Sequence, residues 1–417
     1  MFNSSSNLEE RKKSKRKGKI WQLFRATDFQ SLMYPCFVIS RILGIFPYKI
    51  SASNVEICPS CYMLSTAVVC VYGTLQLVIL YDMNVAKNIL FQTVTRRLER
   101  NSFYIFGAFI TVTTFILNKP RMRFLRSILK HSLKLSPVSY QHMSKLIHLK
   151  DICGFFFVLI SLVYSLMEMH FSLLRKWAIV YLNLVMYQMD MLYMNCVCVL
   201  KACFKQINDS LTHIREVAMN GEPYILNDTG YKQRNQFLLI EIEAVKKQHQ
   251  AVSEAVHTLE TIFSLQLITM AVMTFTQITF NLYFIITQMK SSISISDYEK
   301  SIYYSYSILI TAYHLIKIML IVWACETGKR QAMEIAITVH EIFNSTSNEQ
   351  IKYELRLFSL QLMHHKNTFS IKGLNMDASL LTSIAGGVTT YLLLLIQFLF
   401  AINICDKKSP MSMEDSV

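Results

Sequence analysis

Residues 379–404 read SLLTSIAGGVTTYLLLLIQFLFAINI, a stretch that holds no charged side chain and no proline. A helix rises about 1.5 Å per residue, so roughly twenty residues cross the roughly 30 Å hydrocarbon core of a bilayer. Lipid offers no hydrogen bonds to backbone amides, whereas a helix satisfies them internally. This stretch therefore predicts a membrane-spanning helix.

Six further apolar blocks precede it, and together they predict seven transmembrane helices. The six blocks are Cys61–Tyr81, Asn101–Leu117, Ile152–Leu173, Trp177–Leu200, Ile262–Gln288 and Ile302–Ala324. The composition agrees, because 52% of the 417 residues are hydrophobic and only 17% are charged, which is less charge than a soluble protein of this size carries. The expected fold class is an all-α polytopic membrane protein whose connecting segments form cytoplasmic helical extensions.

Residues 32–50 form an eighth apolar candidate, which helix-breaking and charged residues interrupt. These residues are Pro35, Arg41, Gly44, Pro47 and Lys49. We interpret the segment as an interfacial or re-entrant helix; if it spanned the membrane, the orientation of one end of the chain would reverse. Residues 11–19, RKKSKRKGK, lack the apolar stretch of a signal peptide and predict a cytoplasmic tail, with contact to anionic lipid as the alternative.

Charge favours a cytoplasmic N-terminus, because the segments that would then face the cytoplasm hold most of the Lys and Arg residues. The support is only moderate, since the predicted outside loop near Arg96 and Arg97 is also basic. With this orientation the predicted organisation, in chain order, is a basic N-terminus with an interfacial helix (1–60), four spans (61–200), a cytoplasmic linker and helical extension (201–261), two spans (262–325), a cytoplasmic helical segment (326–378), the last span (379–404) and an extracellular tail (405–417).

The cytoplasmic segments carry their own helical patterns. Apolar residues recur at helical spacing in Gln236–Glu260 and in Tyr353–Phe369, so both are expected to be helices that continue toward the neighbouring spans. Asn220–Arg234 contains two glycines and a proline and is expected to be a flexible linker, and Asn118–Asp151 is expected to be a cytoplasmic loop. Helices that project from a membrane bundle without a catalytic domain suggest a platform for contacts between subunits.

Enzyme signatures are absent from the sequence, which has no phosphate-binding glycine loop, no metal-spaced set of His and Cys and no nucleophile elbow. No cofactor or metal is therefore expected. His364 and His365 are adjacent and would point about 100° apart on a helix, so they do not form a chelate. Cys58 and Cys61 have no matching second pair, and the ten cysteines are interpreted as small apolar residues.

The last span has one face that differs from the rest of the helix. This face recurs at steps of four and three and comprises Ser383, Gly387, Thr390, Leu394, Gln397 and Ala401. A polar stripe in a span faces protein or water rather than lipid. Close helix packing through Gly386 and Gly387 and a pore wall both explain it, although packing alone leaves Gln397 unexplained.

The same helix carries a recognisable motif: Thr390-Tyr391, five apolar residues, then Gln397-Phe398. Together with residues 358–364, FSLQLMH, and residues 385–391, AGGVTTY, it resembles the last helix of insect gustatory receptors, and the resemblance extends over essentially the whole chain. Leu392 stands where the sugar-responsive branch usually has Glu, so membership of that branch is not expected and the ligand class stays open.

The resemblance implies a seven-helix receptor in the plasma membrane with a cytoplasmic N-terminus, related to insect odorant receptors. It implies a homo- or heterotetrameric cation channel, gated by a small-molecule tastant, in which the last helix lines the pore and the helical extensions form an anchor domain. The pore and gate residues would be Thr390, Tyr391, Leu394, Gln397 and Phe398. Membrane lipid is an expected partner and nucleic acid is not.

In such a channel the ligand pocket would lie among the outer halves of the second to sixth spans. Its candidate lining residues are Tyr164, Glu168, Tyr187, Gln188, Gln277, Tyr283 and Tyr304. Aromatic residues near span ends also form interfacial belts, which is the alternative for each of them. Asp190 and Lys317 lie mid-span, where an unpaired charge costs roughly 3 kcal/mol, so they are expected to pair either as a packing ion pair or in coupling ligand to gate.

A G-protein-coupled receptor is the alternative function, because it also has seven spans, but its N-terminus would lie outside. A transporter ranks third, because no inverted repeat or matching pair of broken helices is visible in the sequence.

Overall fold

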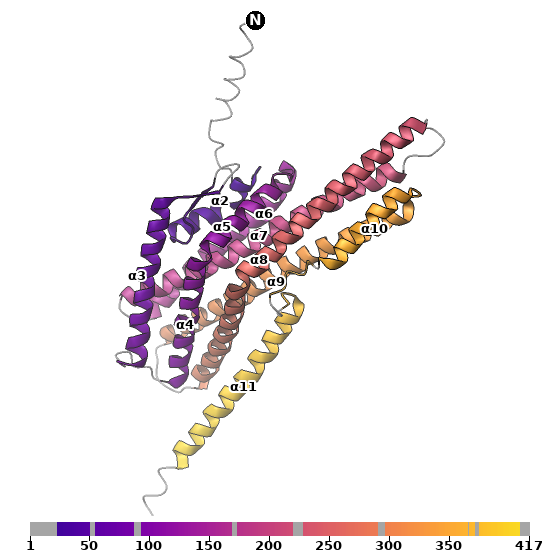
Figure 1. Ribbon diagram of the computed structural model, residues 1–417. Helices are drawn as coiled ribbons and strands as arrows, with labels where there is room; N and C mark the ends of the chain where they lie inside the picture. Colours follow the sequence, from indigo (N-terminus) through magenta and orange to yellow (C-terminus); the bar gives the residue numbers. More distant parts are fainter. Residues whose placement is uncertain are drawn as a thin grey trace, which may run out of the picture.

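The computed structural model describes residues 23–50, 55–86, 93–168, 173–219, 228–290, 297–365, 367–371 and 375–408. The described part is built from helices, with one short antiparallel hairpin near its beginning (Figure 1). In chain order the elements are α2 (Phe29–Ile42), β1 (Tyr48–Ile50), β2 (Val55–Ile57), α3 (Pro59–Asn84), α4 (Val94–Ile116), α5 (Asn118–Ser132), α6 (Pro137–Glu168), α7 (Leu173–Met219), α8 (Asp228–Lys290), α9 (Asp297–Ser345), α10 (Glu349–His364) and α11 (Ala378–Lys408). The predicted all-α class is confirmed.

The described residues of the predicted spans lie on helices, apart from the end residue Leu117, and residues 169–172 of the span Ile152–Leu173 lie outside the described part. Fewer of these helices are both long and apolar enough to cross a membrane. Among the described residues, α3, α6, α8, α9 and α11 are long and apolar enough to cross a membrane. Helices α4 and α5 would make a sixth span if they count as one, although the chain bends by 62° between them. The count of membrane-compatible helices is thus five or six rather than seven.

Helix α7 fails the test because it is polar inside the bundle rather than apolar toward lipid. Every residue from Val185 to Leu200 is buried, including Gln188, Asp190 and Asn195. A helix that is surrounded by protein needs no lipid-compatible surface, because its polar side chains find partners on neighbouring helices. Helix α7 is therefore the central element against which α2, α6, α8 and α9 pack.

The connecting segments are more helical than the sequence predicted. The expected loop Asn118–Asp151 is α5 followed by the first half of α6. Its many basic residues hid an amphipathic pattern, since α5 buries Phe124, Leu125 and Ile128.

Two further expectations for the connecting segments are wrong in part. Helix α8 begins at Asp228, so residues 228–234 of the expected flexible linker are helical, while residues 220–227 lie outside the described part. One glycine inside a helix costs about 1 kcal/mol, which a long packed helix can offset. The helix expected to reach Phe369 ends at His364, and Phe369 has a left-handed backbone with φ 49°.

Helices α7, α8 and α9 extend well beyond the thickness of a membrane and project from one end of the bundle together with α10 (Figure 1). Helix α8 has 63 residues and is about 95 Å long at about 1.5 Å per residue, compared with a hydrocarbon core of roughly 30 Å. Polar contacts join the projecting parts, including Lys246 Nζ to Glu354 Oε2 at 2.6 Å and an Arg215–Glu341 ion pair. The Gln236–Glu260 prediction of a continuous helical extension is confirmed.

Helix α2 has 14 residues and is about 21 Å long, shorter than the hydrocarbon core. It buries Leu32, Met33 and Cys36 against α6 and α7, and Asp28 caps its first turn by accepting a hydrogen bond from the Ser31 backbone. Its position at the membrane interface stays a prediction.

Candidate functional site

Helix α11 is the least covered of the long apolar helices, and it lies along the edge of the bundle (Figure 1). Only 6% of its most apolar stretch is buried, compared with 67% for α8. A helix of this kind leaves most of its surface to lipid or to other chains. The chemistry of its exposed side chains therefore indicates whether this surface faces lipid or other chains.

The predicted pore residues are all exposed, although Tyr391 also contacts α8. Thr390, Leu394 and Gln397 are exposed, and the exposed fractions of Tyr391 and Phe398 are 56% and 68%. The Thr390 hydroxyl donates to the backbone carbonyl of Gly386 at 2.9 Å, so the helix itself satisfies it. The amide of Gln397 has no hydrogen bond to the part of the chain that the structure describes.

Another side of α11 packs against α8. Leu392 and Leu395 pack against a cluster of three aromatic residues, Phe280, Tyr283 and Phe284. Further along α8, the ring of Phe275 lies 5.6 Å from the ring of Tyr391 and against Gly387, where an added Cβ would meet Phe275 Cε2 at 3.0 Å. Gly387 therefore serves close helix packing, while its exposed stripe neighbours do not.

Asp190 on α7 and Lys317 on α9 are brought together in the bundle. Lys317 Nζ lies 3.0 Å from Asp190 Oδ2, and the side chains are 6% and 2% exposed, respectively. The ring centroid of Tyr313 lies 5.3 Å from the same ammonium group. The two mid-span charges thus form a buried, desolvated ion pair between the fourth and sixth predicted spans.

Two polar residues next to this pair were not singled out by the sequence analysis. Gln266 on α8 lies beside Asp190, and His314 on α9 lies beside Lys317. Both are buried, and neither the amide of Gln266 nor Nδ1 of His314 has a hydrogen-bond partner within the described residues. The signal in the sequence was a polar side chain inside each of two predicted spans, although these spans also hold other polar residues such as Gln277 and Lys317.

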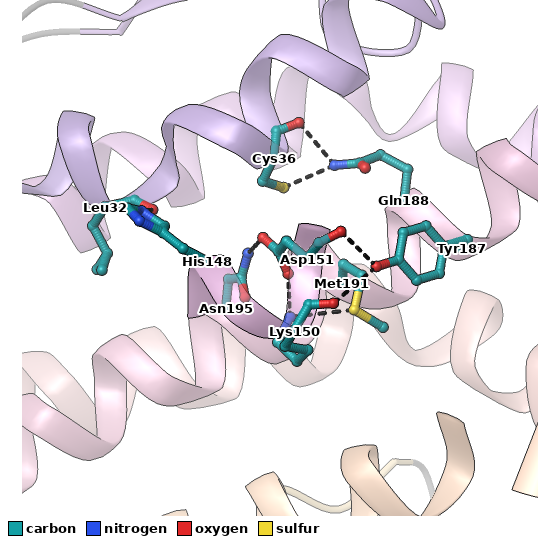
Figure 2. Close-up of polar contacts among 9 residues, drawn as sticks. All are labelled: Leu32, Cys36, His148, Lys150, Asp151, Tyr187, Gln188, Met191 and Asn195. Carbon is teal, nitrogen blue, oxygen red and sulfur yellow. Dashed lines mark hydrogen bonds and ion pairs between the residues drawn. The ribbon is translucent and has the colours of Figure 1, made fainter. Parts of the chain in front are cut away.

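Tyr187 and Gln188, two of the predicted ligand contacts, form hydrogen bonds between helices (Figure 2). The Tyr187 hydroxyl donates to the backbone carbonyl of Asp151 at 2.9 Å, and Gln188 Nε2 donates to the carbonyl of Cys36 at 2.8 Å. Both side chains are almost fully buried. They join α7 to α6 and α2, respectively.

The same region holds a buried charged group that the sequence analysis did not name. Asp151 pairs with Lys150 and accepts a hydrogen bond from Asn195 Nδ2 at 2.7 Å (Figure 2). One helical turn earlier on α6, His148 bridges the backbone amide of Phe24 and the carbonyl of Leu32, both at 3.0 Å. These contacts hold the beginning of the described chain against the bundle.

The remaining predicted ligand residues lie at different interfaces. Gln277 on α8 is buried with its Nε2 unpaired among the described groups, Tyr283 faces α11, and Tyr304 on α9 is half-buried. Tyr164 and Glu168 lie on α6, and their side chains fall outside the described residues. The described members of this set therefore do not line one common interface.

A second apolar cluster between α3, α4, α7 and α8 has the composition of a small-molecule site. Its buried members are Tyr72, Ile79, Met83, Phe103, Tyr104, Ile110, Ala178, Ile179, Leu182, Met186 and Met273. We call it the α3–α4 cluster. Tyr72 donates to the Ala178 carbonyl at 2.9 Å and lies within 3.4 Å of the Gln76 amide, so a few polar groups accompany aromatic and methionine side chains.

Within the described ranges no three His, Cys, Asp or Glu side chains gather in a way that could hold a metal ion.

Comparison with known families identifies the family of this chain. The family model described as 7tm Chemosensory receptor matches residues 33–402. The chain belongs to this family. The resemblance drawn from the motif of the last helix is thereby confirmed.

Known relatives are gustatory receptors of Drosophila melanogaster. The chain is 31% identical to putative gustatory receptor 28b over 155 residues, which cover 36% of this chain and 32% of the relative. It is 27% identical to putative gustatory receptor 28a over 169 residues, covering 40% of this chain and 38% of that relative. The matches therefore span about a third of the length of the first receptor and somewhat more of the second.

Among solved structures, the chain is similar to the insect olfactory receptor OR5 from Machilis hrabei. The TM-score is 0.61 at 11% identity, and the alignment covers 88% of this chain and 98% of the olfactory receptor. The structure of the same receptor in complex with eugenol gives the same values. At 11% identity this likeness shows that the two proteins share a fold, and it shows nothing further.

Proposed function

We propose that this chemosensory receptor is a subunit of a tastant-gated, non-selective cation channel in the plasma membrane of chemosensory neurons. Four copies, of this chain alone or with relatives, place α11 around a common axis and let its polar stripe line the pore. The observation that carries the proposal is the combination of low burial and a polar stripe on α11.

Lipid alone does not suit this helix. The exposed Leu393 and Phe398 are compatible with acyl chains, and the threonine hydroxyls are satisfied by their own helix. The amide of Gln397 is different, because an unpaired amide in hydrocarbon costs at least about 1–3 kcal/mol. A water-filled pore shared by several subunits removes that cost.

The gate of the proposed channel is formed by neighbouring residues on α11. Gln397 and Phe398 point about 100° apart on the helix, so a rotation of α11 exchanges one for the other at the axis. A ring of Phe398 side chains excludes water and blocks ions without a plug. Gln397 turned inward offers amide oxygens that replace part of the hydration shell of a cation.

The ligand site of the proposed channel lies on the extracellular side of the buried ion pair. It is formed by α4, α8 and α9 and by the adjoining α3–α4 cluster. Gln277 supports this position, because it is buried and its amide Nε2 has no partner among the described groups. The Asp190–Lys317 pair joins α7 to α9 and thereby couples movements in this region to the rest of the bundle.

Electrophysiology tests the channel directly. In a heterologous cell, ligand-evoked current should persist when G proteins are blocked, which a G-protein-coupled receptor would not allow. Phe398→Ala should raise current in the absence of ligand, and Gln397→Ala should change cation permeability ratios more than ligand sensitivity. Leu393→Ala is the matched control, because Leu393 is also exposed on α11 but lies off the stripe.

Currents must be normalised to receptor at the cell surface. If basal current and permeability ratios of both variants equal those of Leu393→Ala, the gate does not lie at these residues. An epitope placed before Arg11 should be reachable only after permeabilisation, and labelling of both ends of the chain from one side would contradict the proposed orientation.

A further inference from the structure

The N-terminal end of α3 brings two cysteine sulfur atoms close together. The sequence there is Cys58-Pro-Ser-Cys61, α3 begins at Pro59, and Cys58 is the residue that precedes its first turn. The Cys61 thiol donates a hydrogen bond to Cys58 Sγ at 2.7 Å. Both cysteines are only partly buried, whereas Cys36, Cys196, Cys198, Cys203 and Cys325 are buried.

The surroundings of Cys58 favour its thiolate. The hydrogen bond from Cys61 lowers the pKa of Cys58, and the positive charge of Arg41 acts in the same direction. The free backbone amides and the dipole at the start of a helix also stabilise a negative charge there. Cys58 is therefore the nucleophilic thiol. Cys61 lies one helical turn away, where it can react with an oxidised Cys58 sulfur.

We propose that Cys58 and Cys61 form a redox-modification site, which a peroxide closes into a disulfide and a dithiol reductant reopens. The geometry is nearly that of the product, because a disulfide has an S–S distance of about 2.05 Å and the sulfurs are 2.7 Å apart. Partial exposure gives a small oxidant access to both. A zinc site is a poorer interpretation, since two thiolates lack the further protein ligands that zinc sites have, and the described residues supply no third.

The reaction proceeds in two balanced steps. The Cys58 thiolate attacks one oxygen of hydrogen peroxide, the O–O bond breaks, and sulfenic acid and hydroxide form. The Cys61 sulfur then attacks the Cys58 sulfur, the S–O bond breaks, and the departing hydroxide takes the Cys61 thiol proton to become water. The hydroxide of the first step takes up the proton that Cys58 lost on ionisation, so in sum two thiols lose two electrons and two protons, and peroxide becomes two molecules of water.

The disulfide would restrain the first turn of α3, which lies next to the β1–β2 hairpin. The Cys58 backbone amide donates to the Pro47 carbonyl at 3.1 Å, and Arg126 of α5 donates to the Val55 carbonyl at 2.6 Å. The hairpin thus already links α3 to α5. In the proposed orientation this end of α3 faces the cytoplasm, where thiols are kept reduced, so the disulfide forms only under oxidative load; this last step alone rests on the proposed topology.

Peptide mass spectrometry of the full-length receptor in cell membranes tests the site. Membranes are exposed to hydrogen peroxide, free thiols are blocked with N-ethylmaleimide, and the protein is cleaved with trypsin. Residues 50–87 contain no internal Lys or Arg, so one peptide carries Cys58, Cys61 and the exposed Cys70. Cys70 is thus a control within the same peptide.

The wild-type peptide should carry one maleimide, on Cys70, after peroxide and three after peroxide followed by dithiothreitol. Cys61→Ser should accumulate a sulfenic acid on Cys58 that dimedone traps, and Cys70→Ser should still close the pair. Size-exclusion profiles matching the wild type show that the variants are folded. Three maleimides on the wild-type peptide after peroxide, or oxidation of Cys70 at the same rate as Cys58, would overturn the proposal. Neither readout depends on channel activity.

Discussion

The buried ion pair between Asp190 and Lys317 offers a quantitative test of how the bundle is held together. We consider three variants: Asp190→Leu, Lys317→Met and the double substitution. The pair is desolvated on all sides, since the side chains are 2% and 6% exposed and 3.0 Å apart. Each single substitution therefore leaves one uncompensated charge inside the bundle.

The expected energies follow from that geometry. Removing one partner of a buried pair costs about 3–5 kcal/mol, because the remaining charge stays without its counter-ion. Lys317→Met also removes the contact with the Tyr313 ring, which adds about 0.5–2 kcal/mol. Replacing both charges with apolar residues of similar volume is often nearly neutral. The double variant should therefore be more stable than either single variant.

Apparent melting temperatures in mild detergent, read by size-exclusion chromatography after heating, measure this difference. At about 2 °C per kcal/mol for a chain of this size, Asp190→Leu should lower the melting temperature by about 6–10 °C and Lys317→Met by about 7–14 °C. The control is the exposed pair Glu243–Lys247 on α8, with side chains 54% and 72% exposed, for which loss of either charge should shift the value by less than about 2 °C. If the double variant loses the sum of the two single losses, the charges do not stabilise one another and the reasoning fails.

Two further predictions concern close packing and pH. Gly154→Ala would place a Cβ 2.3 Å from the Tyr187 hydroxyl and should cost about 1–3 kcal/mol, whereas Gly73→Ala, with no atom within 4 Å, should be neutral or slightly stabilising; melting temperatures of both variants compare the two sites. His249 lies on α8 outside the predicted span, and burial, with the nearby His365, lowers its pKa to about 4. The unfolded chain takes up this proton near pH 6.5 and the folded chain only near pH 4, so the contribution to stability is complete above pH 6.5 and falls by about 1.4 kcal/mol per unit between these values. His249→Gln should remove this part of the pH dependence between pH 7.5 and 5, and an unchanged pH profile of the melting temperature would contradict the assignment.

The spans could be predicted from sequence because membrane thickness imposes a length on apolar helices. Blocks of about twenty residues stand out wherever a helix faces lipid, as in α3 and α11. Helix α7 was still recognisable as a block, although its polar residues lower its hydropathy. What the sequence could not show is that these polar residues are buried rather than exposed to a pore.

The helical nature of the segments between spans was harder to predict. Helix α5 is rich in Arg and Lys, and one of these, Arg121, is buried over the ring of Phe263 at 5.3 Å. A buried arginine cannot be distinguished from a solvated one by composition. The hairpin of β1 and β2 has three residues in each strand, too few for a periodic pattern to emerge.

For the candidate site, the sequence was most informative about charged residues, because an unpaired charge inside a span carries the largest energetic penalty. Two charges in mid-span must find partners, and Asp190 and Lys317 are in contact. Tyrosine and glutamine carry smaller penalties and find partners in many ways, so the sequence could not tell that Tyr187 and Gln188 bond to backbone carbonyls of α6 and α2. Their contacts depend on neighbours that lie far away in sequence.

Helix α8 connects the features that the proposed channel requires. It carries Gln266 beside the buried ion pair, Phe275 and Phe280 against α11, and His249 in the projecting region. Because these contacts lie on one continuous helix, a displacement near the ion pair reaches the α11 contact through a rigid rod rather than through loops. Gly387 allows α11 to approach this rod closely at Phe275, and a side chain there would hold the two helices further apart. A rotation of α11 that moves its exposed stripe would also turn Gly387 and Tyr391 relative to Phe275, so the contact with α8 and the proposed gate would change together.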